Sequence, residues 1–372
     1  MTPRPRLAVF LDPATHHLEN DRLFDDDAHE LAGDRLLAPF AYLRRRFAEQ
    51  GVPLHTGDFL ERGDVVAEHN VYLSLGMRTR WPRLAQRDDV TLSAFFTHES
   101  PIVEPKLFRD LEQVAHSFGR VFSFTYAESL RPFLTAPVAT LHYRLPQSFD
   151  SVHAEHWSRR DRQFLTIINA NKRPRLTTSE LYTERLLAVE FFGRTGEVDL
   201  YGVGWDVPPY HVGQTWEPVA LQRIKRRAQA HWAKVRPDPL LVAARGAWRG
   251  SVQDKASTLA GYTFALCLEN MVLPGWITEK IFDCLCAGTV PLYLGDPRIA
   301  EVVPPECFVD LRDFSDYAAL SAYLHALSPA EVESMREAGR DFIGSAAFHP
   351  FSKAAFADLI GGIVAEDHAR RA

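Results

Sequence analysis

Cysteine is scarce in this chain, with 4 residues among 372. Each thiol lies among apolar residues of an expected strand or helix, where free cysteine behaves as a small buried hydrophobe. These positions do not form a disulfide framework, and cysteines of this kind are typical of a reducing compartment. A zinc site is disfavoured, because two cysteines separated by one residue face different sides of a helix. The residues concerned are Cys267, Cys284, Cys286 and Cys307.

The chain also lacks a long apolar run and an excess of positive charge. No stretch is long enough to span a bilayer, and the apolar run at residues 7–11 is too short for a signal peptide. The formal charge of −6 argues against nucleic acid as the main partner, because phosphate backbones select basic faces. We therefore expect a cytoplasmic protein with no transmembrane segment, and peripheral association with the inner face of the membrane stays open.

Length and patterning predict two α/β domains. A chain of 372 residues exceeds a usual single domain, and a hydrophobic content of 46% excludes long disorder. Short apolar runs alternate with helical patterns, which indicates mostly parallel sheets with helices on both faces. A polar stretch from 146 to 161 separates two such series. The expected strands are 7–11, 71–75, 90–96, 121–125 and 140–145, then 164–168, 198–201, 263–268 and 290–294.

The expected helices follow from apolar residues at helical spacing. Ser328 is a candidate N-cap, with Pro329 at the first helical position and Glu331 in the first turn. The ranges are 36–50, 108–118, 181–192, 317–327, 329–342 and 351–365.

Residues 262–314 hold the densest set of signals. The strand 263–268 ends in Glu269 and Asn270, and ligands bind at the carboxyl ends of strands in open parallel sheets. Thr278 is a plausible N-cap that places Glu279 and Lys280 in the first turn of a helix. The sequence therefore predicts a strand, a loop and a helix, followed by the strand 290–294.

Lys280 is the residue in this stretch that suggests chemistry. A helix N-terminus presents unpaired N–H groups and a partial positive charge, and an ammonium there adds to its attraction for phosphate. An alternative interpretation is that Glu279 and Lys280 are ordinary solvated residues of a first turn. Spacing alone does not distinguish the two.

The order of these residues resembles the donor-binding region of the α-1,3-fucosyltransferases, glycosyltransferase family 10, in their bacterial form. The family pattern is an F-x-x-x-x-E-N block, an aromatic-x-T-E-K block, then A-G-x-V-P and a late D-F. The residues that fill it in order are Phe264, Glu269-Asn270, Trp276, Thr278-Glu279-Lys280, Ala287 to Pro291, and Asp313-Phe314.

The resemblance implies a GT-B arrangement, in which two Rossmann-like domains face a cleft. We expect an acceptor-side domain at 1–150, a nucleotide-sugar domain at 162–345, and a C-terminal helix at 346–372 that packs back on the first domain. The implied activity is inverting transfer of L-fucose from GDP-fucose to a glycan acceptor. Two alternatives are the same catalyst with another nucleotide sugar, and a non-catalytic sugar-binding derivative.

The resemblance also assigns roles to residues. Glu99 lies in a Glu-Ser-Pro element that matches the family's proposed general base, and His98 is a competing base with a suitable intrinsic pKa. The donor-binding residues are Arg185, Asn270, Trp276, Glu279 and Lys280, with Lys280 and Arg185 on the diphosphate. Arg173 and Arg175 compete with Arg185 for that assignment. Further candidates are Gly202, Lys255 and Glu269.

Three substitutions separate the chain from the family pattern. Trp276 stands where tyrosine is frequent, Met271 where serine is common, and Arg249 where an aromatic residue is expected. Gly202 and Gly204 resemble the start of a dinucleotide fingerprint without its third glycine, so a tight turn is favoured over NAD binding.

We expect no obligatory metal cofactor. Three consecutive aspartates, Asp25 to Asp27, could suggest Mn²⁺, but they lie far from the phosphate-binding stretch and are typical of a solvated loop. His16, His17 and Glu19 are interpreted in the same way. Stimulation by Mn²⁺ or Mg²⁺ is compatible with this expectation.

Overall fold

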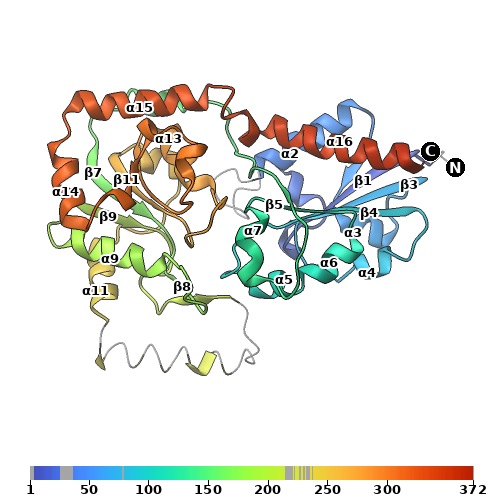
Figure 1. The fold of residues 1–372 in the computed structure, drawn as a ribbon, viewed down its shortest axis with the longest axis horizontal. Helices are drawn as coiled ribbons and strands as arrows, with labels where there is room; N and C mark the ends of the chain where they lie inside the picture. Colours follow the sequence, from blue (N-terminus) through green and yellow to red (C-terminus); the bar gives the residue numbers. More distant parts are fainter. Residues whose placement is uncertain are drawn as a thin grey trace. The chain divides into compact units, whose positions relative to one another are not determined.

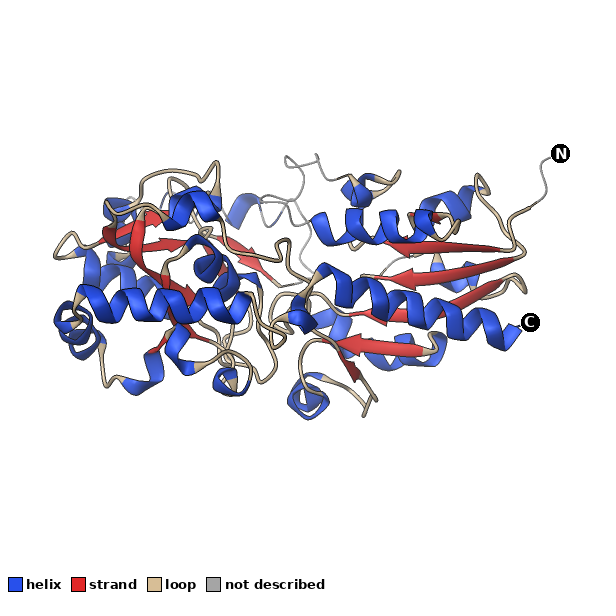
Figure 2. Cartoon of the chain, turned by 90° about the horizontal axis from the view of Figure 1, so that it is seen from above, coloured by secondary structure: helices blue, strands red, loops and turns tan. Residues whose placement is uncertain are grey.

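A computed structural model describes residues 4–25, 37–77, 79–213 and 238–371, with 221, 223–225, 228, 231, 235 and 236 between the last two ranges. Contacts divide the chain into two compact units. Unit 1 comprises residues 1–101, 106–150 and 348–372, and unit 2 comprises 102–105 and 151–347. Each unit has its own parallel sheet (Figure 2). The predicted α/β class with two Rossmann-like domains is therefore confirmed.

Unit 1 is built on a parallel sheet whose strand order in the described residues is β2-β1-β3-β4-β5-β6. Its core is aromatic, with Phe10, Tyr72 and Phe95 fully buried. The strands are β1 (Leu7–Asp12), β2 (Leu54–His55), β3 (His69–Ser74), β4 (Val90–Phe96), β5 (Arg120–Ser123) and β6 (Leu141–His142).

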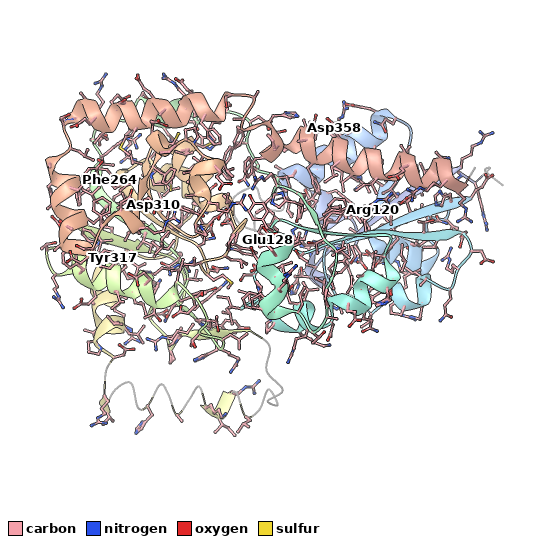
Figure 3. The ribbon with its side chains drawn as sticks, in the orientation of Figure 1. Arg120, Glu128, Phe264, Asp310, Tyr317 and Asp358 are labelled. Atoms are coloured by element: carbon pink, nitrogen blue, oxygen red, sulfur yellow. The ribbon has the colours of Figure 1, made fainter. Side chains whose placement is uncertain are left out.

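Helices α2 (Ala38–Glu49) and α16 (Lys353–Arg371) lie side by side in unit 1 (Figure 1). The buried residues of α16 recur every three or four positions, from Phe356 to Asp367, so one face packs on β3, β4 and α2. Arg120, labelled in Figure 3, fixes the end of α16 through a 3.0 Å ion pair with Asp367. No helix among the described residues combines the length and apolar character that crossing a membrane requires.

Shorter helices complete unit 1. They are α3 (Gly57–Arg62), α4 (Trp81–Leu84), α5 (Pro105–Arg109), which begins at the boundary with unit 2, α6 (Leu111–Ser117) and α7 (Ala127–Leu130), with 3₁₀ turns η1 (His16–Leu18), η2 (Arg22–Phe24), η3 (Arg131–Phe133) and η7 (His349–Phe351).

Unit 2 is built on a second parallel sheet with the order β13-β12-β11-β7-β9. Phe264, labelled in Figure 3, lies in its core with Leu165 and Leu292. The strands are β7 (Gln163–Ile168), β9 (Val198–Tyr201), β11 (Tyr262–Leu268), β12 (Val290–Leu294) and β13 (Val309–Asp310). A separate parallel pair joins β8 (Lys172–Pro174) to β10 (Tyr210–Val212).

The helices of unit 2 pack around this sheet. Tyr317 on α14, labelled in Figure 3, donates a hydrogen bond to Glu184 on α9 and joins two helices that are distant in sequence. The helices are α8 (Ala154–Trp157), α9 (Tyr182–Gly193), α11 (Pro239–Ala247), α12 (Lys255–Leu259), α13 (Glu279–Ala287), α14 (Tyr317–Ala326) and α15 (Pro329–Ile343), with 3₁₀ turns η4 (Ile299–Glu301), η5 (Pro305–Cys307) and η6 (Leu311–Asp313).

Local sequence signals match most elements. The predicted strands 90–96, 198–201 and 290–294 have the bounds of β4, β9 and β12. Ser328 and Glu331 form the reciprocal capping box at α15. The four cysteines are buried and free, as predicted.

The predicted helix 108–118 is wrong as a single element. It divides into α5 and α6 at Asp110. The carbonyl of Arg109 accepts a hydrogen bond from the Thr135 hydroxyl at 2.8 Å. A tertiary contact therefore takes an acceptor that a continuous helix would use for its own ladder. The β8–β10 pair was not predicted, because each strand has three residues, too few to show a strand pattern.

Candidate functional site

Helix α13 begins where the sequence predicts, with Thr278 as N-cap and Gly288 closing the helix in the left-handed conformation at φ 69°. The Thr278 side chain does not cap the helix. Its N–H and hydroxyl donate instead to the Glu269 carboxylate at the end of β11, at 2.9 and 2.8 Å. The first turn of α13 is thereby attached to the end of a buried strand.

The C-terminal end of α13 is held by two arginines. Arg162 donates to the carbonyl of Ala287 at 3.4 Å, and Arg336 donates to that of Gly288 at 2.7 Å. Cations suit the negative end of the helix dipole. The helix that carries Lys280 is therefore fixed at both ends.

Lys280 extends its ammonium back over the N-terminus of α13. The Nζ atom lies 3.0 Å from Glu269 Oε2, 2.8 Å from Thr278 Oγ1 and 3.6 Å from Glu279 Oε1. Burial opposes the charged form, but Glu269 and Glu279 outweigh it, so the pKa of Lys280 is raised. The side chain keeps 24% of its surface exposed. It is thus a charged group that a ligand can reach.

Arg185 on α9 lies against the same strand end. Its Nη2 donates to the carbonyl oxygens of Leu268 and Glu269 at 2.8 and 2.7 Å, and to Asn270 Oδ1 at 3.2 Å. Burial lowers the pKa of Arg185. The hydrogen bond from the Leu181 N–H to the Asn270 carbonyl, at 3.0 Å, anchors the start of α9 to the loop after β11.

Lys255 joins the site from α12. Its ammonium pairs closely with Asp283 and lies 3.9 Å from Glu279 Oε1. Burial would raise the pKa of Glu279, yet Lys280 and Lys255 lower it to about 2. Glu279 is therefore a carboxylate at neutral pH. Asp283 was missed by sequence analysis, because an aspartate within a helix is usually a solvated residue.

These basic side chains line a small pocket. Its volume is about 30 Å³, which holds about two water molecules. A nucleotide does not fit inside it, so only a small part of a ligand, such as a phosphate oxygen or a hydroxyl, can reach in. The lining residues are Ile167, Ile168, Asn169, Arg185, Lys255, Leu259, Ala265 to Leu268, Lys280 and Cys284. Arg173 and Arg175 are not among them, and Arg173 pairs with Asp238 at 2.6 Å.

The charges around this pocket balance. Three cations, Arg185, Lys255 and Lys280, line it, and three carboxylates accompany them from Glu269, Glu279 and Asp283. Opposed charges held in fixed positions form an oriented polar environment, which stabilises developing charge without reorganisation. The arrangement suits a diphosphate whose negative charge grows as a bond to it breaks.

Asn169 is a pocket residue that sequence analysis did not single out. Its Oδ1 is buried and has no hydrogen-bond partner among the described residues, while its main-chain oxygen accepts from Trp205 Nε1 at 2.9 Å. Gly202 approaches that oxygen so closely, at φ 128°, that a Cβ would lie 2.1 Å from it. Gly202 therefore shapes a tight turn, as predicted. The polar strand end 169–173 was the available signal for Asn169.

Asn270 and Trp276 lie in the loop between β11 and α13. Asn270 contacts Arg185, whereas the Trp276 side chain is buried with 2% of its surface exposed. Trp276 therefore presents almost no surface to a ligand in this structure. Direct contact between Trp276 and a donor stays a prediction.

Glu99 and His98 follow β4 in unit 1. Glu99 Oε2 accepts a 3.3 Å hydrogen bond from the Ser100 N–H. His98 Nε2 is buried and has no partner among the described residues. Burial lowers the pKa of His98 to about 4, so its ring is neutral near pH 7 and a weak base. A base with a pKa near the operating pH is more effective, and this disfavours His98.

Hydroxyl groups from neighbouring strands hold the segment that carries these two residues. Thr97 Oγ1 donates to Ser123 Oγ at 3.1 Å, Ser123 Oγ lies 2.8 Å from Thr125 Oγ1, and Tyr143 Oη donates to the Thr97 carbonyl at 3.0 Å. Buried hydrogen-bond networks of this kind make a loop rigid.

The described residues contain no group of three or more His, Cys, Asp or Glu side chains placed to hold a metal ion. Of the three consecutive aspartates, Asp25 is the C-cap of η2, and Asp26 and Asp27 lie outside the described residues.

The region around α13 is similar to known proteins. Residues 241–336 match the model of "Glycosyltransferase family 10 (fucosyltransferase) C-term". The chain is 36% identical over 90 residues to α-(1,3)-fucosyltransferase FucT of Helicobacter pylori, covering 23% of this chain and 19% of that protein. It is 42% identical over 73 residues to α-(1,3)-fucosyltransferase 7 of Bos taurus, covering 19% and 21%. The match spans about a fifth of the length of these relatives.

Solved structures are similar over nearly the whole chain. An α-glucosyltransferase in complex with UDP and a 13-mer DNA aligns with a TM-score of 0.53 at 11% identity, covering 96% of this chain and 99% of that chain. A crystal structure of α1,3-fucosyltransferase with GDP-fucose aligns with a TM-score of 0.45 at 14% identity, covering 98% and 91%. The chain has an α/β fold of GT-B type.

Proposed function

We propose that this chain, whose residues 241–336 match the model of glycosyltransferase family 10, is an inverting fucosyltransferase. It moves L-fucose from GDP-fucose to a hydroxyl of a glycan acceptor. The observation that carries the proposal is the meeting of Lys280, Arg185 and the N-terminus of α13 at one strand end. Lys280 and α13 lie in the matched region and Arg185 lies outside it. Together they suit the leaving diphosphate of a nucleotide sugar.

On the donor side, unit 2 supplies cationic hydrogen-bond donors at fixed positions. Lys280 binds the diphosphate. Arg185 donates hydrogen bonds from Nη2 to main-chain oxygens at the strand end, and its positive charge lies behind that end. The ionised Glu279 accepts hydrogen bonds from ribose or fucose hydroxyls. Asn270 completes the donor contacts, and the buried Trp276 supports the loop that carries Asn270. As the bond from the sugar to the diphosphate breaks, the electron pair leaves with GDP, and these cations stabilise the growing charge.

On the acceptor side, Glu99 acts as the general base. The acceptor hydroxyl attacks the anomeric carbon of fucose from the face opposite to GDP, and its proton passes to the Glu99 carboxylate. Inversion at that carbon follows from the single displacement. The neutral, weakly basic His98 ranks second for this role.

Binding of nucleotides tests the donor assignment. A ligand that binds only the folded state at about 100 times its Kd adds roughly 2.7 kcal/mol of stability. GDP and GDP-fucose should raise the melting temperature of the chain, and UDP, ADP and CMP should leave it unchanged. Thermal melts with each nucleotide measure this.

The outcomes of these melts separate the proposal from its alternatives. A shift with UDP-sugars and none with GDP would reject fucose transfer in favour of another nucleotide sugar. No shift with any nucleotide, from a folded sample, would favour a non-catalytic protein. If GDP-fucose binds and is only hydrolysed slowly, the donor assignment stands and other glycans are tested as acceptors.

Removal of divalent metals should leave activity largely intact. Lys280, Arg185 and the α13 N-terminus supply the positive charge that a metal would otherwise bring to the diphosphate. We expect transfer in excess EDTA to stay within about tenfold of the rate with Mn²⁺ or Mg²⁺, the fold-change of about 1.4 kcal/mol of barrier. Complete loss in EDTA, reversed by adding metal, would contradict this expectation.

A further inference from the structure

Glu269 is the only residue in the described part of the site whose main chain and side chain each contact a proposed diphosphate cation. Its carbonyl oxygen accepts from Arg185 Nη2 at 2.7 Å. Its Oε2 atom accepts from Lys280 Nζ at 3.0 Å and from the Thr278 hydroxyl at 2.8 Å. One residue therefore links α9, β11 and the first turn of α13.

The Glu269 side chain is fully buried by the described residues around it. None of its surface is exposed, whereas Lys280 keeps 24% exposed. Gly295 lies against it so closely that a Cβ there would be 2.5 Å from Glu269 Cγ and 2.6 Å from Tyr293 Oη. A ligand can therefore reach the Lys280 side chain but not the carboxylate beneath it.

The buried Glu269 carboxylate restricts the position of the flexible Lys280 side chain. Its ammonium is a point charge on a four-carbon stem, so it does not fix its own position. The charge of Glu269 and the hydroxyl of Thr278 hold Nζ above the start of α13 from two sides. Restricting a group to its binding conformation before the ligand arrives lowers the entropy that binding costs.

We propose that Glu269 is a positioning residue, which holds Lys280 and the first turn of α13 in the arrangement that receives the donor diphosphate. The inference rests on the proposed function and deepens it. From the sequence, Glu269 was a candidate for contact with the donor. The structure places Glu269 beneath Lys280, where it is buried and acts on the donor through Lys280.

The variant Glu269→Gln tests this role, because glutamine keeps the size and one acceptor oxygen for Thr278 but removes the charge. We expect GDP to bind about tenfold more weakly at pH 7.5, measured by calorimetry. The pH dependence of binding is the second readout. Glu269 raises the pKa of Lys280 against the effect of burial, so in the variant the ammonium is lost at a lower pH. The alkaline limb of GDP affinity should therefore move to lower pH.

A matched control is Glu301→Gln, an exposed glutamate of the same unit that pairs with Arg298 at 2.7 Å. It should leave GDP affinity and its pH limb unchanged. If Glu269→Gln does not fold, Thr278→Val replaces it, since valine keeps the branched shape and removes the hydroxyl that Lys280 contacts. We expect several-fold weaker GDP binding from that variant.

These measurements distinguish a failure of the proposed function from a failure of the positioning role of Glu269. A wild-type chain that does not bind GDP would reject the proposed function. Wild-type GDP binding that neither Glu269→Gln nor Thr278→Val weakens, with an unmoved alkaline limb, would reject the positioning role and leave the proposed function intact.

Discussion

Lys280→Ala should reduce GDP affinity by about tenfold to a hundredfold and nearly abolish the thermal shift that GDP produces. A hydrogen bond to a charged group contributes about 1.5–3 kcal/mol, and Lys280, in the first turn of α13, keeps 24% of its side chain exposed. Fucose transfer should fall further, because the charge on the diphosphate grows in the transition state. Calorimetry with GDP and steady-state kinetics measure the two effects.

This substitution also leaves Glu269 buried without its partner. Breaking a buried ion pair typically costs 3–5 kcal/mol of stability, and the partly exposed Lys280 places the cost at the low end. A melt without ligand separates this loss from the loss of binding. Lys280→Arg keeps the charge and should retain part of the GDP affinity. Lys106→Ala, an exposed lysine on α5, is the control that should change neither measurement. Wild-type GDP affinity in a folded Lys280→Ala variant would remove Lys280 from the donor site.

Glu99→Gln should lower kcat for transfer by about 10²–10⁴, the usual contribution of a general base. GDP affinity should stay within about twofold of wild type, a difference of about 0.4 kcal/mol, because Glu99 belongs to unit 1 and the diphosphate site to unit 2. Initial rates with saturating GDP-fucose, beside GDP calorimetry, measure the separation. A wild-type kcat would exclude Glu99 as the base.

Two variants control for indirect effects at Glu99. Glu112→Gln changes an exposed glutamate on α6 and should leave kcat unchanged. His98→Ala should be milder than Glu99→Gln, because the buried neutral ring of His98 is a poor proton acceptor. A larger loss from His98→Ala than from Glu99→Gln would reverse the two assignments.

The local sequence determined the elements that carry the site. Thr278 followed by an acidic and a basic residue, with apolar positions at helical spacing and Gly288 at the end, specified α13 with its bounds. The apolar runs of β9, β11 and β12 specified buried strands in the same way. These signals are short-range, because capping, periodicity and turn chemistry depend on residues within a few positions of one another.

Only the tertiary structure decided what each charged side chain does. Arg185 and Asn270 are 85 residues apart, and Lys255 and Asp283 are 28 apart. The sequence around a carboxylate at a strand end looks the same whether that carboxylate faces a ligand or lies beneath a lysine. Burial separates the two cases for Glu269, and burial is set by packing with Gly295 and Tyr293 from another strand and its loop. The electrostatic energy of a charge depends on its distance to other charges and on its exclusion from water, and both quantities arise only when distant segments fold together.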